Sequence, residues 1–420
     1  MQGNPAMPER RQLYRDMALI FALALLPRLI LALALPADDS VFIDWPYREY
    51  ARNLAEGRGF WMPNPYSEEV GLDRVYAFRP PLFPFFWGCV YKVTAGAYGP
   101  IRVFFAFLSS LTCVLAYLAG RDLVRGRRVA LLGGVACALY PPLIWHSVHL
   151  MTEPFFIFFS TTAFLGLFRF RATGRVRWLI LAGIAAGLGA LSRSILVAFL
   201  PVMAIWIWWV RGRGRRAVIE TAAYTLIVTL VMTPWIVRNA IRLGAFVPAT
   251  TDAGHGFYVA NNEHSLSDPR GFWIPEDWST VIPPGTGEVE ASRTLMRNAA
   301  RYLAGNPGTA ARLMARRFAT LWRFYPNPEF VGRSKAVVYA LSYVPAFPFM
   351  LLGIWLAHRR ARGRLANVLL VDMLVVYTTC MSVVFLAMMR YRVPLMPFLL
   401  VFAALGAASV WSRLTAALRR

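Results

Sequence analysis

Apolar stretches long enough to cross a bilayer recur along the chain, and clusters of arginine separate them. A helix of about 20 apolar residues spans the ~30 Å hydrocarbon core of a membrane. The 420 residues are 57% hydrophobic and only 16% charged, whereas soluble domains carry about 25% charged residues. These features predict an all-α polytopic membrane protein, a bundle of about ten transmembrane helices. The expected spans are Met17–Pro36, Ile101–Ala119, Val129–Trp145, Pro154–Phe168, Trp178–Leu191, Ile195–Val210, Ala217–Val237, Ala336–Ala357, Leu365–Leu386 and Val393–Trp411.

The arginines indicate which side of the membrane each link faces. A net charge of +23 would suggest nucleic acid as the partner of a soluble protein, but here the basic residues bracket apolar runs, which excludes that partner. With the N-terminus inside, every predicted cytoplasmic link is rich in arginine, as the positive-inside rule requires. These links carry Arg121, Arg125, Arg127 and Arg128; Arg169, Arg171, Arg175 and Arg177; Arg211, Arg213, Arg215 and Arg216; Arg359, Arg360, Arg362 and Arg364; and Arg413, Arg419 and Arg420.

The first apolar run, Met17–Pro36, follows Arg10, Arg11 and Arg15. A signal peptide cleaved after Ala32-Leu33-Ala34 is the alternative to a first transmembrane helix. Because the run is about long enough to span the core and many spans follow it, we interpret it as a transmembrane helix.

Another apolar segment, Pro81–Ala97, is expected to lie at the interface or to re-enter the membrane. If it crossed, every later arginine cluster would lie outside. We therefore treat 1–420 as a single integral membrane domain with two outward-facing loops, 37–98 and 238–335. The second loop is expected to contain turns at Asp252–Gly256 and Pro283–Gly285.

Interfacial helices are expected at 45–56 in the first loop and at Ala291–Ala304 and Thr309–Phe324 in the second, because these segments are amphipathic. The chain contains no internal repeat, which argues against a transporter built from inverted repeats.

Two carboxylates are candidates for acid–base chemistry at the outer ends of helices. Asp44 immediately precedes the helix expected at 45–56, and Glu153 precedes Pro154 at the start of a span. Each has a structural interpretation, Asp44 as an N-cap and Glu153 as an acid in a first helical turn. Alternatively, a carboxylate at membrane level is a base that takes the proton of an acceptor while a lipid-linked donor lies alongside.

Arginines also occur at outer helix ends, where the positive-inside rule disfavours them. A phosphate or pyrophosphate would satisfy such a group by bidentate hydrogen bonding, and pairing with nearby acids or snorkelling to phospholipid headgroups is the alternative. Arg28 is separate, because it lies inside the first span, where charge is a functional candidate by default. The outer-end arginines are Arg79, Arg193, Arg238, Arg390 and Arg392.

Metal and nucleotide motifs are weak in this sequence. His146, His149 and Glu153 are spaced for a divalent metal, but ordinary polar roles are favoured, so we expect no required cofactor. The four cysteines lack CxxC spacing, and no phosphate loop or Rossmann glycine pattern occurs, which disfavours a nucleotide-sugar donor.

Seven segments in order resemble the GT-C superfamily of membrane glycosyltransferases. The resemblance is to the glycosyltransferase family 39-like branch related to protein O-mannosyltransferases and the lipid A aminoarabinose transferase, over roughly residues 15–405. The segments are DWPYREYARNLAEGRGF at 44–60, FRPPLFP at 78–84, MTEPFF at 151–156, ALSRS at 190–194, TPWIVRNAIRLGAFVP at 233–248, GFYVANN at 256–262 and RYRVPLMPFL at 390–399.

The resemblance implies a GT-C-like bundle in a bacterial cytoplasmic (inner) membrane, with the active site facing the periplasm. It implies transfer of a monosaccharide from a polyprenyl-phosphate carrier to a cell-envelope glycan, lipid or protein. Asp44 would be the catalytic base and Glu153 the second-loop acid. The family's arginines that contact the donor phosphate would match Arg193, Arg238, Arg390 and Arg392. Other expected substrate contacts are Arg79, Tyr50, His255, Asn261 and Asn262.

This sequence departs from the family pattern at two places. Trp45 stands where the family often has Glu, so the resemblance implies no paired second acid there. The spacing from Asp44 to Tyr50 and Ala51 is also atypical, so Asp38 and Asp39 are alternatives for the base. Several members also have a soluble C-terminal domain, which we do not expect here. The rival functions are a flippase or transporter of lipid-linked glycans, an O-antigen-type ligase or polymerase that uses pyrophosphate-linked glycans, and a structural membrane subunit.

Overall fold

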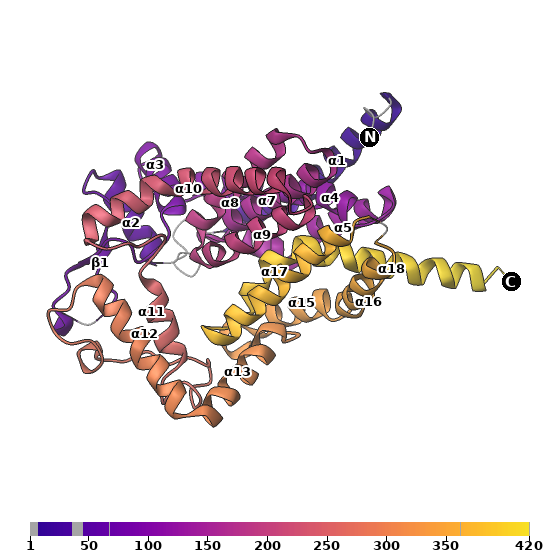
Figure 1. Ribbon diagram of the computed structural model, residues 1–420. Helices are drawn as coiled ribbons and strands as arrows, with labels where there is room; N and C mark the ends of the chain where they lie inside the picture. The colour runs from indigo at the N-terminus through magenta and orange to yellow at the C-terminus, as the bar shows by residue number, and fades with distance from the viewer. Residues whose placement is uncertain (1–6, 36–44, 67, 362, 420) are drawn as a thin grey trace.

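The computed structural model describes residues 7–35, 45–66, 68–361 and 363–419, and it is almost entirely helical (Figure 1). Seven helical stretches in this part are long and apolar enough to cross a membrane. They are formed by α1 (Met7–Ala34), α4 (Gly99–Leu123), α7 (Glu153–Thr173), α10 (Arg215–Leu243), α15 with α16 (Arg333–Tyr343 and Ala346–Arg359), α17 (Leu365–Val384), and the 3₁₀-helix η5 with α18 (Met389–Leu395 and Met396–Ala417).

The predicted all-α polytopic class is confirmed, but the number of ten spans is not. The other three predicted spans coincide with shorter or broken helices. The segment at 129–145 is broken at Tyr140, because Pro141 and Pro142 have no N–H to continue the helical ladder. The shorter helices are α5 (Arg127–Leu139), α6 (Pro141–His146), α8 (Val176–Ser192), the 3₁₀-helix η3 (Ser194–Phe199) and α9 (Leu200–Val210).

The break after α5 explains the buried Arg28. Its guanidinium donates to the carbonyl oxygens of Cys137 (3.3 Å) and Ala138 (2.6 Å). These two carbonyls would accept helical hydrogen bonds from residues 141 and 142, which are both proline and cannot donate. Arg28 therefore replaces the two bonds that the prolines remove, and its place in the first span has a structural reason.

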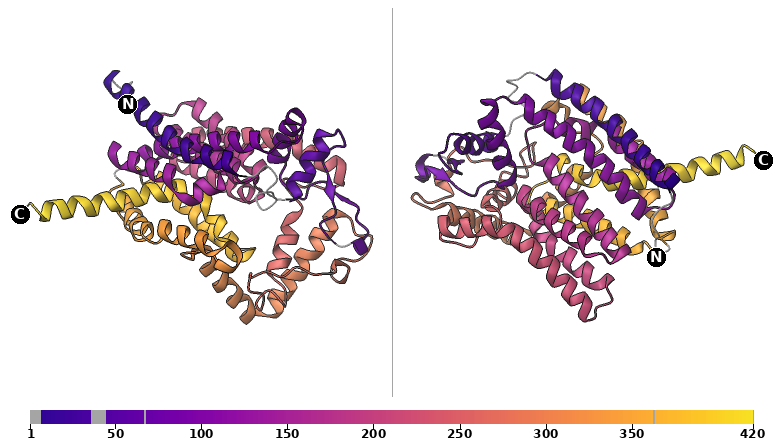
Figure 2. Two further views of the ribbon diagram at one scale, coloured as in Figure 1. Left: turned by 180° about the vertical axis from the view of Figure 1, so that it is seen from behind. Right: turned by 90° about the horizontal axis from the view of Figure 1, so that it is seen from above.

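Ion pairs and hydrogen bonds join the predicted inner links to one another at one end of the bundle. Arg127 pairs with Asp16 (2.5 Å) and Arg169 with Asp122 (2.8 Å). Both chain termini lie at this end in all the views, opposite α2 and β1 (Figures 1 and 2).

The regions predicted to face outward, called outer below, lie at the opposite end of the bundle (Figure 2). The helices predicted at 45–56, 291–304 and 309–324 are present, whereas the turn expected at Asp252–Gly256 is wrong, because this segment begins a helix. Strands β1 and β2 form one antiparallel pair with Met62 opposite Val75. The outer elements are α2 (Trp45–Ala55), β1 (Met62–Pro63), η2 (Glu68–Val70), β2 (Arg74–Val75), α3 (Leu82–Thr94), α11 (Asp252–Ala260), η4 (Trp278–Thr280), α12 (Glu288–Gly305), α13 (Pro307–Trp322) and α14 (Pro328–Val331).

The buried carboxylate of Glu288 joins the two outer loops. It accepts hydrogen bonds from the backbone N–H groups of Tyr76 (2.5 Å) and Ala77 (2.9 Å) and from the hydroxyl of Thr251 (2.6 Å). Burial raises the pKa of Glu288, and these three bonds oppose that rise. One side chain thus holds the segments on either side of the cavity described below.

Helix α3 has 13 residues, about 20 Å of helix, and is too short to cross the ~30 Å core. If the segment 81–97 does not cross the membrane, the link between α4 and α5 lies in the cytoplasm. We therefore expect a reporter inserted at Gly126, in this link, to be cytoplasmic. A phosphatase active only in the periplasm would be silent at Gly126. The same reporter at Asn306, between α12 and α13, serves as the periplasmic control. Phosphatase activity at Gly126 would contradict this topology.

Candidate functional site

A cavity of about 510 Å³ lies between the outer ends of the helices and the second outer loop. Its polar lining includes three arginines and two carboxylates, and its apolar lining comes from several elements, α17 and the residues after it among them. The polar and aromatic lining residues that matter below are Tyr47, Arg79, Glu153, Arg193, Asp252, His255, Tyr377, Arg390 and Tyr391. The apolar ones include Leu374, Met381, Phe385, Leu386 and Met388.

Glu153 forms the centre of the polar end of the cavity. Its carboxylate Oε1 lies 3.0 Å from a terminal nitrogen of Arg193 and 4.0 Å from Nε of Arg390. Pro154 follows it in the first turn of α7, where a missing N–H costs nothing. The carboxylate is buried at 2% exposure, and a buried carboxylate requires such partners.

Breaks in helical structure place both arginines. Arg193 ends α8 in an extended conformation before η3 begins, so its side chain leaves the helix line at the cavity. Arg390 lies in η5, after α17 has ended. The ring of Tyr391 lies between them, with guanidinium carbons 5.0 Å (Arg193) and 5.7 Å (Arg390) from its centroid. These cation–π contacts hold both cations at the wall of the cavity.

A second charged pair faces the cavity from the outer loops. A terminal nitrogen of Arg79 lies 3.1 Å from Oδ2 of Asp252. The hydroxyl of Thr250 donates to the other oxygen of Asp252 at 2.5 Å. Asp252 was not among the predicted site residues, because its segment was interpreted as a turn. An acid at the start of a helix was the signal that could have indicated it.

His255 lies one helical turn after Asp252 in α11, among the rings of Tyr66, Phe78 and Trp278, with centroids 5.0–5.8 Å away. Burial, together with the nearby charge of Arg79, lowers the pKa of His255 to about 3. The imidazole is therefore neutral at pH 7. Within the described residues, its Nδ1 has no hydrogen-bond partner.

Two of the predicted phosphate-binding arginines lie outside this cavity and are bound to backbone oxygens. Arg238 donates to the carbonyls of Phe60 and Tyr76, both at 2.8 Å. Arg392 donates to the carbonyls of Leu321 (3.2 Å) and Arg323 (2.6 Å) at the end of α13.

Three further predicted substrate contacts also lie away from the cavity lining. Tyr50 is buried, accepts a hydrogen bond from the N–H of Phe78 (3.0 Å) and has its pKa raised by burial. Asn261 donates to the carbonyl of Phe257 (2.9 Å) and accepts from Arg317 (2.9 Å). Asn262 stabilises the turn after α11 by accepting from the N–H of His264. The structure thus brings together Glu153, Arg193, Arg390, Arg79 and His255 among the predicted residues, and it leaves Arg238, Arg392, Tyr50, Asn261 and Asn262 elsewhere.

The predicted base, Asp44, and its alternatives Asp38 and Asp39 lie outside the described residues. Helix α2 begins at Trp45, and Tyr47 in its first turn lines the cavity. Within the described residues, no group of three or more His, Cys, Asp or Glu side chains is placed to hold a metal ion.

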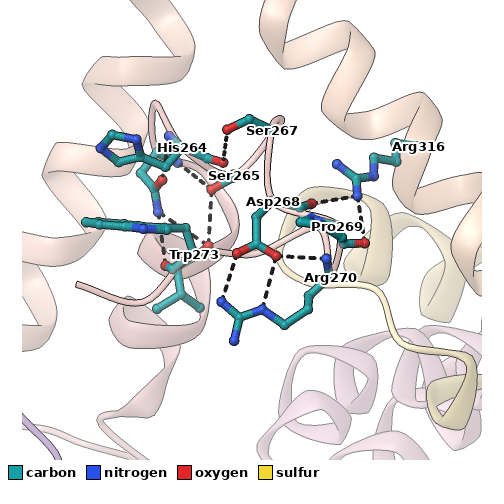
Figure 3. A network of polar contacts seen from close by, with 10 residues as sticks. His264, Ser265, Ser267, Asp268, Pro269, Arg270, Trp273 and Arg316 are labelled. Atoms are coloured by element: carbon teal, nitrogen blue, oxygen red, sulfur yellow. Dashed lines mark hydrogen bonds and ion pairs between the residues drawn. The ribbon is translucent and has the colours of Figure 1, made fainter. Parts of the chain in front are cut away.

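One rim of the cavity is formed by the loop after α11, which contributes Phe272 and Ile274. Figure 3 shows how this loop is held: the guanidinium of Arg270 lies on the carboxylate of Asp268, 2.8–3.0 Å away. Arg316 of α13 donates to the backbone oxygens of Asp268 (2.7 Å) and Pro269 (2.9 Å) (Figure 3). It also donates to the backbone oxygen of Leu266 at 2.7 Å. Arg316 therefore attaches the rim to α13, next to Arg317, which donates to Asn261 at the start of the same loop.

Comparisons with known proteins agree with the resemblance of the sequence to GT-C enzymes. Residues 76–247 match the family model described as dolichyl-phosphate-mannose-protein mannosyltransferase. No curated protein matches the chain.

Solved structures with TM-scores above 0.5 share the fold. The oligosaccharyltransferase AglB from Archaeoglobus fulgidus, in complex with an inhibitory peptide and a dolichol-phosphate, is 13% identical with a TM-score of 0.58, covering 98% of this chain and 52% of that chain. Its apo form is 15% identical with a TM-score of 0.55, covering 96% and 52%. ArnT from Cupriavidus metallidurans bound to undecaprenyl phosphate is 16% identical with a TM-score of 0.42, covering 93% and 78%.

The protein therefore has the fold of the GT-C membrane transferases. The resemblance expected from the sequence is confirmed by the family model over 76–247 and by the fold. The chain spans about half the length of the oligosaccharyltransferase structures that it matches, 52% in each case.

Proposed function

We propose that the protein is a glycosyltransferase that moves a monosaccharide from a polyprenyl-phosphate carrier to an acceptor on the outer face of a bacterial cytoplasmic membrane. The observation that carries the proposal is a cavity that contains Arg193 and Arg390 beside Glu153 together with many apolar side chains. A lipid phosphate is complementary to such a lining, because it has an anionic head and an apolar chain. The similar oligosaccharyltransferase structure holds a dolichol-phosphate.

The charge of the described lining favours an anionic donor. Three arginines and two carboxylates line the cavity, and His255 is neutral, so positive charge exceeds negative charge among the described residues. A sugar linked through a single phosphate carries one negative charge, and a pyrophosphate-linked glycan carries two. Transfer assays with both donors distinguish the proposed enzyme from a ligase or polymerase.

The proposed reaction is a single displacement at the anomeric carbon. Asp44 accepts the proton of an acceptor hydroxyl, and the hydroxyl oxygen forms a bond to the anomeric carbon. The bond from that carbon to the phosphate oxygen breaks, and its electron pair leaves with the polyprenyl phosphate. Negative charge grows on the phosphate as the bond breaks, and arginines aimed at that position stabilise it.

Glu153 is proposed to position the arginines in the empty site. Two guanidinium groups close to each other repel, and the buried carboxylate between them offsets this repulsion. A guanidinium carries five N–H donors and can contact a carboxylate and a phosphate together. Glu153 is therefore proposed to hold Arg193 and Arg390 in position before the donor binds.

The direct test is transfer by the purified full chain from a synthetic radiolabelled polyprenyl-phosphate monosaccharide to a cell-envelope membrane fraction. We expect label in the acceptor fraction together with release of polyprenyl phosphate, and little transfer from the matching pyrophosphate-linked sugar. Movement of the intact donor across liposomes without transfer would instead indicate a flippase and would overturn the proposal.

A further inference from the structure

A second polar pocket lies at the opposite end of the bundle from the cavity, among the arginine-rich links. It has a volume of about 360 Å³ and lies between the ends of α4, α7, α9 and α17. Its lining residues are Asp122, Arg171, Ala172, Val210, Gly363, Arg364 and Asn367. The proposed transfer reaction does not use any of them.

Hydrogen bonds across four elements hold the pocket in shape. Arg171 donates to the carbonyl of Gly363 at 2.7 Å and contacts Oδ1 of Asn367 at 3.4 Å. Asn367 donates in turn to the carbonyl of Asp122 at 3.1 Å. The indole of Trp206 in α9 donates to the carbonyl of Ala366 at 2.8 Å, which fixes α9 against the start of α17. The pocket is therefore built from residues far apart in the chain.

Positive charge exceeds negative charge in this pocket. The carboxylate of Asp122 is occupied by Arg169, with 2.8 Å between Oδ2 and Nε. This leaves Arg171, bound only to neutral oxygens, and Arg364. In the part of the chain that the structure describes, the half-buried guanidinium of Arg364 makes no hydrogen bond or ion pair. Arg364 also precedes the N-terminus of α17, whose helix dipole favours an anion.

The position of the pocket relative to the membrane surface indicates the source of its ligand. Trp208 and Trp209 are 38% and 37% exposed and directly precede Val210, which lines the pocket. Exposed tryptophans concentrate at the level of lipid headgroups. A basic pocket between transmembrane helices at that level has the chemistry of a site for an acidic headgroup.

We propose that this pocket binds a phosphate group through Arg171 and Arg364, and that the phosphate belongs to the headgroup of an anionic phospholipid in the leaflet next to the arginine-rich links. The bound lipid joins the ends of α4, α7, α9 and α17. The site is independent of the proposed glycosyl transfer, because it lies at the other end of the bundle.

The test is native mass spectrometry of the full chain taken from nanodiscs of phosphatidylcholine with or without phosphatidylglycerol. We expect the wild-type protein to retain phosphatidylglycerol selectively and to unfold at a higher temperature in its presence. Arg364→Gln removes a guanidinium that makes no hydrogen bond or ion pair with the described residues and interacts with Asp122 only at longer range, so folding should survive. Affinity for phosphatidylglycerol should fall about ten- to hundredfold, the cost of one charge-assisted contact. Arg171→Gln should weaken binding to a similar degree.

The matched control is Arg215→Gln, which removes an exposed arginine from the same end of the bundle but outside the pocket. It should keep the selective binding. Equal binding by wild type and Arg364→Gln would overturn the proposal, as would a loss of the same size in Arg215→Gln. Inorganic phosphate is the second probe. Inorganic phosphate added in pure phosphatidylcholine could raise the unfolding temperature of the wild type as much as phosphatidylglycerol does. That result would show that the site binds free phosphate, and the proposal of a lipid headgroup would be wrong.

Discussion

Asp44→Asn is expected to lower the rate of glycosyl transfer about 10²–10⁴-fold, the usual contribution of a general base. Asparagine caps a helix about as well as aspartate, and α2 begins at the next residue, Trp45. The substitution should therefore leave the unfolding temperature and the affinity for the donor unchanged. The measurement is the transfer rate at saturating donor, with the unfolding temperature recorded for the same preparation.

Asp73→Asn is the matched control, because Asp73 is an exposed acid of the same outer loop and does not line the cavity. Its transfer rate should equal that of the wild type. A well-folded Asp44→Asn protein with normal turnover would refute the assignment. Asp38→Asn and Asp39→Asn would then identify the base, because each removes one of the remaining candidates in the same segment.

The fold was largely predictable because its determinants are local in the sequence. Apolar length gives the spans, and arginine position gives the side of each link. The break between α5 and α6 was missed, although Pro141 and Pro142 stand inside the predicted span. A hydropathy scale does not account for a missing backbone N–H, although the missing donor interrupts the hydrogen bonds of the helix. Arg28 had no assigned partner for the same reason, since its acceptors are the carbonyls that these prolines leave free.

The site was only partly predictable, because arginines at outer helix ends look alike in a sequence. Arg193 and Arg390 reach the cavity, and Arg238 and Arg392 do not. The difference depends on which distant carbonyl oxygens the fold places beside each guanidinium. Arg392 lies beside the end of α13, some 70 residues earlier in the chain, and helix ends have carbonyls without intrahelical partners. No spacing rule gives that proximity. Asp252 was missed because its partner, Arg79, comes from the other outer loop.

The second large effect is expected on donor binding, when the arginines that line the cavity beside Glu153 are replaced. Arg193→Gln and Arg390→Gln should each weaken binding of the polyprenyl-phosphate sugar about ten- to hundredfold, because a hydrogen bond to a charged group contributes about 1.5–3 kcal/mol. If the two act independently, the double variant should lose about 10²–10⁴-fold. Titration calorimetry of the detergent-solubilised protein with the synthetic donor measures the dissociation constant directly. Arg301→Gln, which changes an exposed arginine of α12, is the matched control.

Arg193→Gln also removes a partner of Glu153, so weaker binding could reflect the broken ion pair instead of a lost phosphate contact. The double variant Arg193→Gln with Glu153→Gln separates the two effects. A buried carboxylate that has lost a partner destabilises the fold, and making it neutral should restore the unfolding temperature. Donor affinity should remain low, because the guanidinium that meets the phosphate is still absent. Recovery of donor affinity together with stability would show that Arg193 serves only Glu153, and it would remove Arg193 from the phosphate site.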